Sequence, residues 1–210
     1  MKLVKNTKYY GDVVYEFNLP VGHTCPYAVE CLVSVNKETG KFKNESKSFR
    51  CYASSAERFP GVRNSRWTNF DYVKDGNEIV LDKKVERVRI HASGDFFSQA
   101  YFDMWLETCR KYPNVEFWAY TKSLPFWVAR LDVIPENLTI TASRGGKFDD
   151  LIEKHDLKNV RVVERNLVEF TSDSTAIVDG VEYLIDFIDD IARRKDVKSF
   201  ILLDNNKKLK

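Results

Sequence analysis

The stretch "VERVRIHASGDFFSQAYFDMWLETCRKYPNVEFWAY", residues 85–120, contains a strand, a helix and a second strand in succession. Val85, Val88 and Ile90 mark the first strand, since apolar residues recur along it. An amphipathic helix over 98–112 follows with Ser98 as its N-cap, and "VEFWAY" at 115–120 is the second strand. A helix between two such strands predicts that they lie parallel in one sheet, joined by a right-handed crossover.

The same alternation continues toward the C-terminus. The sequence predicts helices over 124–131, 147–155 and 181–195, and strands over 137–142, 159–164 and 199–203. Residues 171–180 form a break before the last helix, whose inward face would comprise Val181, Leu184, Ile185, Ile188 and Ala192. Five strands alternating with helices predict an α/β protein with a parallel sheet, either doubly wound and open or an incomplete barrel.

The first 80 residues lack this rhythm. Short β-like pieces occur at 12–20 and 31–36, and a turn occupies 37–41. One helix is predicted to begin near Cys51, and another behind Asn64 or Ser65. We therefore expect a single domain over 1–210, with an irregular N-terminal part at 1–80 and a β/α repeat part at 81–210.

Composition limits the function classes. The 210 residues are 43% hydrophobic and 30% charged, which is typical of a globular protein. A net charge of +2 does not favour nucleic acid or an anionic membrane as the main partner. The N-terminus lacks the apolar run of a signal peptide, and no stretch reaches membrane-spanning length. We expect a cytoplasmic protein.

Polar residues follow four of the predicted strands. They are His91, Ser93, Gly94 and Asp95; Thr121, Lys122 and Ser123; Ser143, Arg144 and Gly145; and Glu164, Arg165 and Asn166. In both candidate architectures the carboxyl ends of parallel strands lie at one edge, where ligands bind. These four groups therefore predict a site.

Three of the four cysteines differ from the fourth in context. Cys109 lies on the apolar face of the 98–112 helix and is expected to be a buried core residue. Five residues separate Cys25 from Cys31, and nineteen lie between Cys31 and Cys51. Cys51 would open a helix, whose N–H groups lower a thiol pKa and favour the thiolate that a metal requires.

The residues leave alternatives open for these thiols. A zinc site could include His23, but the usual zinc spacing of two to four residues between cysteines does not occur. Three cysteines with an open position suit a cubane iron–sulfur cluster that leaves one iron for a small ligand.

Other function classes fit the sequence less well. A zinc-stapled module could bind nucleic acid through Arg58, Arg63 and Arg66, interleaved with Phe59, Trp67 and Phe70. A metal-free thiol or hydrolase-type α/β enzyme is disfavoured, since there is no Gly-x-Ser-x-Gly elbow and no Walker loop.

The chain resembles the radical S-adenosylmethionine (SAM) enzymes in two respects. Its cysteines lie early in the sequence, the last of them in "CYA", and a β/α repeat follows them. Those enzymes hold a [4Fe–4S] cluster on three cysteines inside a partial (β/α)6 barrel. "HASGDFF", "AYTKS" and "TASRG" resemble the strand ends that contact SAM in that superfamily. The chain departs from the pattern in its wider cysteine gaps, and in having aspartate rather than glutamate after Gly94.

The resemblance implies roles for particular residues. Cys25, Cys31 and Cys51 would bind the cluster, with Tyr52 packed against it. Asp95 would accept from the SAM amino group, while Lys122 or Arg144 would balance its carboxylate. The remaining cofactor contacts would be Ser93, Gly94, Thr121 and Ser143. The protein would be a radical SAM-type enzyme that needs an electron donor, or a derivative that no longer cleaves SAM.

Three segments are more closely similar to a protein family encoded by phages and plasmids. They are "FNLPVGHTCPYAVEC", "FRCYASSAERFPGVRNSRWTNF" and "RIHASGDFFSQAYFDMWLE", and the similarity covers roughly residues 15–145. This resemblance identifies a family of relatives but implies no reaction.

Overall fold

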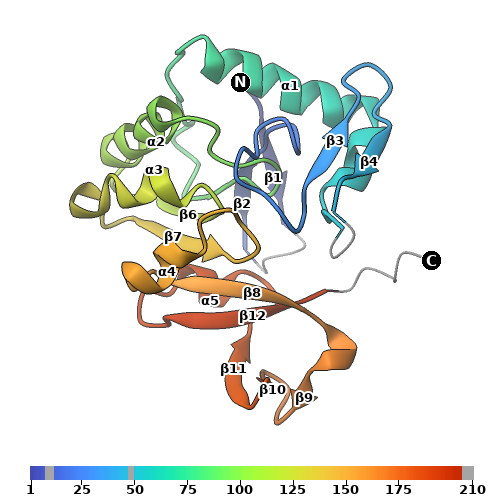
Figure 1. The fold of residues 1–210 in the computed structure, drawn as a ribbon. Coiled ribbons are helices and arrows are strands. Elements are labelled where there is room, and N and C mark those ends of the chain that lie inside the picture. Colours follow the sequence, from blue (N-terminus) through green and yellow to red (C-terminus); the bar gives the residue numbers. More distant parts are fainter. Residues whose placement is uncertain (8–11, 47–49, 205–210) are drawn as a thin grey trace.

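The computed structural model describes residues 1–7, 12–46 and 50–204, and its centre is a ten-stranded sheet (Figure 1). The strands lie in the order β1-β2-β5-β6-β7-β8-β12-β11-β10-β9. Their bounds are β1 Leu3–Asn6, β2 Val14–Phe17, β5 Arg87–Ile90, β6 Glu116–Thr121, β7 Leu138–Ser143, β8 Asn159–Glu164, β9 Glu169–Phe170, β10 Thr175–Val178, β11 Val181–Ile185 and β12 Ser199–Asp204. A separate hairpin pairs β3, Val33–Val35, with β4, Phe42–Asn44.

Neighbouring strands are parallel from β2 across to β11. The first five of them, β2, β5, β6, β7 and β8, follow one another in chain order. Antiparallel strands border this region, with β1 on one side and the β9–β10–β11 ribbon on the other. The predicted α/β class with a mostly parallel sheet is confirmed.

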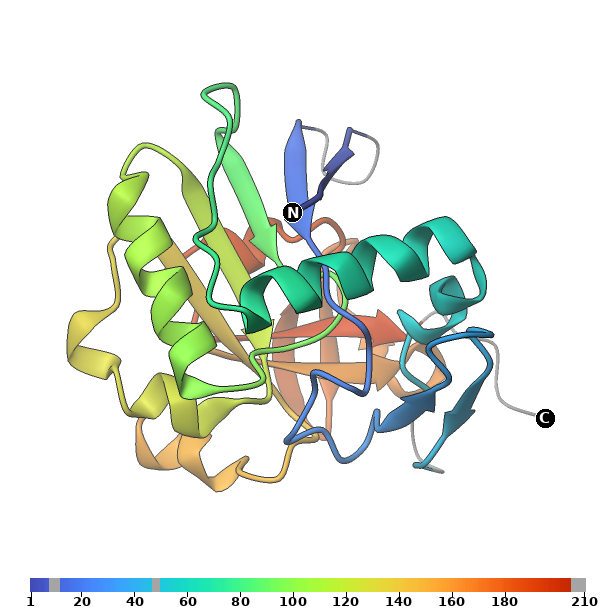
Figure 2. The same ribbon diagram turned by 90° about the horizontal axis from the view of Figure 1, so that it is seen from above.

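Helices lie between the strands of the parallel region. They are α1 Pro60–Lys74, α2 Gln99–Lys111, α3 Leu124–Val128, α4 Asp150–Lys154 and α5 Asp190–Arg193, with a 3-10 helix η1 over Ser54–Arg58. Figure 2 shows α1, α2, α3 and α4 grouped on one side of the sheet. No helix among the described residues is long and apolar enough to cross a bilayer.

The main core lies between this helical layer and one face of the sheet. Trp105 and Cys109 of α2 pack with Val88, Ile90 and Phe117 of the strands, and all five side chains are fully buried. The N-cap prediction for α2 is confirmed, because Ser98 Oγ accepts from the Tyr101 N–H at 3.2 Å. Cys109 is the core residue that its position on the helix predicted.

The opposite face of the sheet is more polar and only partly covered. Ile191 and Ala192 of α5 pack there against Trp118, Val160 and Phe200. Arg89 lies between the core residues Val88 and Ile90 and points to this second face, because side chains alternate along a strand. We call this second, partly open side the concave face.

The predicted helix over 181–195 is wrong. Residues 181–185 form β11, which pairs antiparallel with β10, and only Asp190–Arg193 is helical. The hairpin turn is Asp179-Gly180, with φ values of 52° and 79°. Positive φ at both positions is the type I′ turn that Asp-Gly favours between antiparallel strands. The predicted break at 171–180 therefore contains strand β10 and the hairpin turn that follows it.

Other boundaries also shift. The helix expected behind Asn64 or Ser65 begins earlier, at Pro60, because proline is favoured in the first turn. Cys51 lies three residues before the short helix η1 rather than opening a longer helix. The 147–155 helix is reduced to Asp150–Lys154.

Candidate functional site

The segment before Cys25 crosses the carboxyl end of β5. The N–H of Leu19 donates to the Ser93 carbonyl at 2.9 Å, and Ser93 Oγ donates to the Leu19 carbonyl at 2.7 Å. Gly94 lies against the same segment with a φ of +87°, and a Cβ there would come within 2.6 Å of Leu19 and Thr24. The chain leading to Cys25 is therefore fixed at the end of β5, and glycine is needed for the close approach.

The loop from Cys25 to Cys31 is held at the end of β7. Val29 and Glu30 donate their backbone N–H groups to the Gly145 carbonyl, at 3.2 and 3.0 Å. Lys147 donates its N–H to the Tyr27 carbonyl at 2.9 Å. These bonds hold the loop over the same edge of the sheet as Ser93, because β5 and β7 run in the same direction.

The third cysteine segment is anchored by a buried ion pair. Glu57 of η1 is fully buried and lies 2.8 Å from Arg66 of α1. Arg66 also donates to the Ala53 carbonyl at 3.2 Å, while Glu57 accepts from the Val21 N–H at 3.3 Å. Next to Cys51, the Tyr52 hydroxyl donates to the Ala92 carbonyl at the end of β5. All three cysteine segments therefore lie at the carboxyl ends of the parallel strands.

The three thiols are free and affect one another electrostatically. Burial is the main cause that raises the pKa of each, and it raises that of Cys51 to about 11. The neighbouring thiols Cys51 and Cys31 raise the pKa of Cys25 further, and Cys31 does the same to Cys51. Residues that are distant in sequence thus lie within electrostatic range of one another.

The pKa expected for Cys51 is wrong in direction. Hydrogen bonds from the backbone of Ala53 and Ser54 do lower the pKa of Cys51, as the predicted helix start would. Desolvation outweighs both these hydrogen bonds and the smaller lowering effect of Arg66, because burial disfavours the charged thiolate. Within the described residues, no three His, Cys, Asp or Glu side chains are gathered closely enough to hold one metal ion.

Asp95 joins the ends of β5 and β6. Its carboxylate accepts from the Thr121 hydroxyl at 2.6 Å, from the Lys122 N–H at 2.8 Å and from the Phe96 N–H at 2.7 Å. Burial raises the pKa of Asp95 to about 6, although these three bonds oppose the shift. The carboxylate that the resemblance assigned to the SAM amino group is thus already bound by protein donors.

Lys122 continues the chain of contacts to β7. Its ammonium donates to the Ser143 carbonyl at 3.0 Å, to Ser143 Oγ at 2.9 Å and to the Arg144 carbonyl. Arg144 extends to Asn159, at 3.0 Å, and to Glu153, at 2.6 Å. The carboxyl ends of β5, β6 and β7 are therefore linked to one another, and Arg144 links them to Asn159 at the start of β8.

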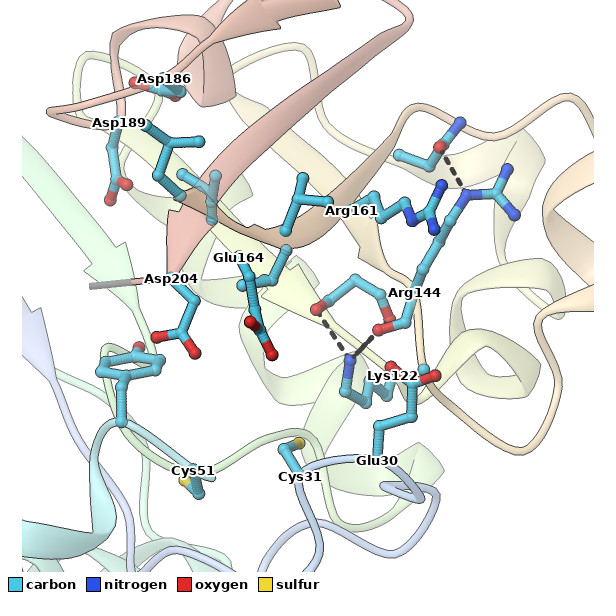
Figure 3. A pocket seen from close by; sticks show the side chains of 18 of the residues that line it. Glu30, Cys31, Cys51, Lys122, Arg144, Arg161, Glu164, Asp186, Asp189 and Asp204 are labelled. Carbon is cyan, nitrogen blue, oxygen red and sulfur yellow. Dashed lines mark hydrogen bonds between the residues drawn. The ribbon is translucent and has the colours of Figure 1, made fainter. Parts of the chain in front are cut away.

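A cavity of about 1000 Å³ opens beside these strand ends on the concave face (Figure 3). Cys31 and Cys51 line it from one side, facing Glu164 and Asp204 across the opening, and Lys122 lies next to Cys31. Of the predicted cofactor contacts, Lys122, Ser143 and Arg144 line this cavity. The others, Ser93, Gly94, Asp95 and Thr121, do not line it, and neither does Cys25.

The structure also brings in residues that the sequence analysis missed. Asp189 is buried and accepts from Trp118 Nε1 at 3.1 Å and from the Tyr120 hydroxyl at 3.0 Å. Arg89 lies 3.1 Å from the same carboxylate. Both residues line the cavity. The sequence did indicate a polar face here, because Arg87 and Arg89 alternate with apolar neighbours. A strand buried equally on both faces would be apolar throughout.

The zinc site and the nucleic-acid module were both predicted with residues that have other contacts in the structure. His23 packs against Trp67 and Phe70 of α1, each at 4.7 Å between ring centroids. Arg63 and Arg66 are buried and bound to protein oxygens, so they are not presented to nucleic acid. The predicted basic and aromatic surface of the nucleic-acid module is therefore not formed by these two arginines.

His91 supports the strand-end loop from within the core. It follows β5 with a φ of 65°, a left-handed conformation that is uncommon for residues other than glycine, and its Nε2 lies 2.8 Å from the Tyr101 hydroxyl. Burial, with a smaller contribution from Arg89, lowers the pKa of His91 to about 3. The structure therefore makes His91 a buried structural residue, held by the Tyr101 hydroxyl, rather than a member of the site.

His91→Asn is expected to weaken the pH dependence of stability, since asparagine tolerates the left-handed conformation and does not titrate. The unfolded histidine takes up a proton below its usual pKa of 6.5, whereas the folded one stays neutral. Wild-type stability should fall by about 1.4 kcal/mol per pH unit from this group as pH drops below 6.5. Urea denaturation at pH 7 and pH 4.5 measures the difference. Tyr101→Phe, which keeps the imidazole buried, should retain the full wild-type slope.

Comparison with known proteins identifies relatives. The profile described as "Gene product 88" matches residues 2–205. A "Gene 88 protein" of Mycobacterium phage D29 is 43% identical over 53 residues, and one of Mycobacterium phage L5 is 42% identical over 52 residues. Each match covers 25% of this chain and only 20% of the relative's length. No solved structure matches the chain.

Proposed function

The chain belongs to the Gene product 88 family, which confirms the predicted phage-type relatives, and from this premise we propose that it is an iron–sulfur protein. In this proposal Cys25, Cys31 and Cys51 hold a [4Fe–4S] cluster, and SAM binds in the adjacent cavity. The observation that carries the proposal is the convergence of three separate cysteine segments on one edge of a parallel sheet, beside a cavity that two of the thiols line.

The donor set suits such a cluster. Thiolates are preferred ligands of iron–sulfur clusters, and the mutual repulsion of these three would be relieved by bound cations. Hydrogen bonds from the backbone of Ala53 and Ser54 to Cys51 are of the kind that tunes such sites. Sulfurs that bind different irons of a cube stand farther apart than the ligands of one ion. The described residues contain no three-ligand set for a single ion, which is compatible with that wider spacing.

The architecture supports the same proposal. Six of the seven parallel strands, β2, β5, β6, β7, β8 and β12, are interpreted as an incomplete (β/α)6 barrel whose concave face holds the cavity. A doubly wound sheet reverses its strand order at the switch point, whereas here five strands follow in chain order.

The residues divide into those that contact the ligand and those that position them. When bound, a cluster of this kind supplies an electron to a ligand at its open iron. Lys122, Ser143 and Arg144 are placed to contact that ligand, since they line the cavity. Asp95, through Thr121 and the Lys122 N–H, is a positioning residue for the β6 end.

Two further groups shape the surroundings of the thiols. Ser93 and Gly94 fix the segment before Cys25, through the bonds to Leu19 and the close approach to Thr24. Tyr52 lines the cavity next to Cys51 and limits the access of water to that side. A redox site of this kind requires a donor of electrons. Free thiols suit a reducing compartment, which in this proposal is the host cytoplasm.

Anaerobic purification followed by metal analysis and paramagnetic resonance tests the proposal. We expect a brown protein with about four irons per chain, and a resonance spectrum of the reduced protein that changes when SAM is added. A cluster spectrum that SAM leaves unchanged would retain the iron site and remove SAM. Colourless protein with one zinc per chain would overturn the proposal in favour of a zinc-stapled structural module.

A further inference from the structure

Each of the two thiols that line the cavity has a cation within electrostatic range. Burial raises the pKa of Cys31 and that of Cys51, and in each case a cation acts in the opposite direction. For Cys31 this cation is Lys122, which also lines the cavity, and for Cys51 it is Arg66 of α1. Arg66 is only 7% exposed and does not line the cavity, so it acts on Cys51 from within the protein.

The Arg66 guanidinium is fixed between two of the cysteine segments. Its Nη1 donates to the carbonyl of Ala53, in the third cysteine segment, at 3.2 Å. The same nitrogen donates to Glu57 Oε1 at 2.8 Å, and that oxygen also accepts, at 3.3 Å, from the N–H of Val21, in the segment before the first cysteine. Arg66 and Glu57 therefore join the first cysteine segment to the third.

The charges of this pair are only partly matched to each other. A single hydrogen bond joins the two side chains, whereas an arginine and a carboxylate can form two parallel ones. Arg66 Nε and Glu57 Oε2 are both buried, and neither has a hydrogen-bond partner among the described residues. Because water does not reach the pair to screen it, the charge of the guanidinium acts on its neighbours at close to full strength.

We propose that Arg66 sets the reduction potential of the cysteine site, and that Glu57 is the positioning residue that holds the guanidinium near Cys51. A [4Fe–4S] cluster that takes up one electron gains one negative charge, and no bond is formed or broken. A buried cation stabilises that added charge, so Arg66 favours the reduced form. The inference rests on the proposed iron–sulfur function and deepens it, because it assigns control of the site to a residue that is neither a ligand nor part of the cavity.

A redox titration of anaerobically purified protein tests the proposal. Dithionite supplies the electrons, paramagnetic resonance detects the reduced cluster, and iron is measured on the same samples. Glu57→Gln keeps the hydrogen-bonding oxygen but removes the counter-charge of Arg66. At a fixed potential it should raise the ratio of reduced to oxidised cluster about tenfold, which is an upward shift of about 59 mV for a one-electron couple.

The double variant Glu57→Gln/Arg66→Gln should shift the potential in the opposite direction, to below the wild-type value. It removes both charges, and the two amides can still form a hydrogen bond, so no unpaired charge is left buried. A purely structural role would not move the two variants in opposite directions. Arg66→Lys, which keeps the positive charge, should stay close to the wild-type potential.

Arg130→Gln/Asp103→Asn is the matched control. It also removes an ion pair, but this pair is about one-third exposed and lies outside the cavity, so the potential should not change. Thermal melts verify the folding of every variant.

The inference is overturned if Glu57→Gln does not raise the potential, or if the double variant raises it too. Should the double variant lose its iron, the shift in Glu57→Gln decides alone. Wild-type protein without iron would overturn the iron–sulfur function and this inference with it. Iron-loaded protein whose potential is the same in all variants would overturn this inference alone.

Discussion

Replacing Cys25, Cys31 and Cys51 together by serine is expected to reduce bound iron from about four atoms per chain to none. Serine keeps the size of the side chain but lacks the soft sulfur that iron–sulfur clusters require. Iron analysis of anaerobically purified protein measures the effect.

The same variant should also lose stability, because ligand binding at a site absent from the unfolded chain is folding free energy. Its melting temperature should match that of wild-type protein stripped by a chelator, and both should lie below that of the iron-loaded protein. Cys109→Ala is the control: Cys109 is buried in the α2 core and lines no part of the cavity, so iron content should stay at the wild-type value. A triple variant that still carried iron would show that other residues bind it.

Asp95→Ala is expected to destabilise the protein by about 4 kcal/mol at pH 7.5. The substitution leaves the Thr121 hydroxyl and the N–H groups of Lys122 and Phe96 without their acceptor in a buried place, and each such loss costs about 1–3 kcal/mol. Since this carboxylate joins the ends of β5 and β6, its loss should also displace Lys122 from the cavity wall. Urea denaturation measures the free energy of unfolding.

The stability of Asp95→Asn should lie between that of wild-type protein and that of Asp95→Ala, because the amide keeps one accepting oxygen. Asp103→Ala is the comparison at the surface: Asp103 also binds through its carboxylate, to Arg130 at 2.7 Å, but the pair is about one-third exposed. An exposed pair is worth about 0–1 kcal/mol, so Asp103→Ala should cost far less. Equal losses for Asp95→Ala and Asp103→Ala would contradict the role of Asp95 as a buried link between strand ends.

The β/α rhythm could be predicted from the sequence because it is local. The strands now seen as β5, β6, β7, β8 and β12 overlap the ranges that alternating or continuous apolar residues indicated, and β6, β7 and β12 each end one residue later than predicted. The N-cap of α2 and the core position of Cys109 followed from spacing along one helix. The polar groups at the strand ends were also found, since parallel strands bring their carboxyl ends to one edge.

The hairpin β10–β11 was not predicted, because its second strand also fits a helical pattern. Val181, Leu184, Ile185 and Ile188 satisfy a helical period, but the same residues follow an Asp-Gly pair that favours a type I′ turn. Pairing with β10 on one side and β12 on the other decided the outcome. Hydrogen bonding to two neighbouring strands outweighed the helical periodicity.

By itself the sequence determined the alternation of strands and helices from β5 to β8, the set of polar strand ends and the three exceptional cysteines, because each depends on residues close together in the chain. Only the tertiary structure decided which of those polar groups face the cavity. Asp95 and Thr121 turn inward to bind each other, while Lys122 and Arg144 line the opening. Arg66 is buried by its pairing with Glu57. The physical reason is that burial and partner choice depend on packing between segments that are distant along the chain.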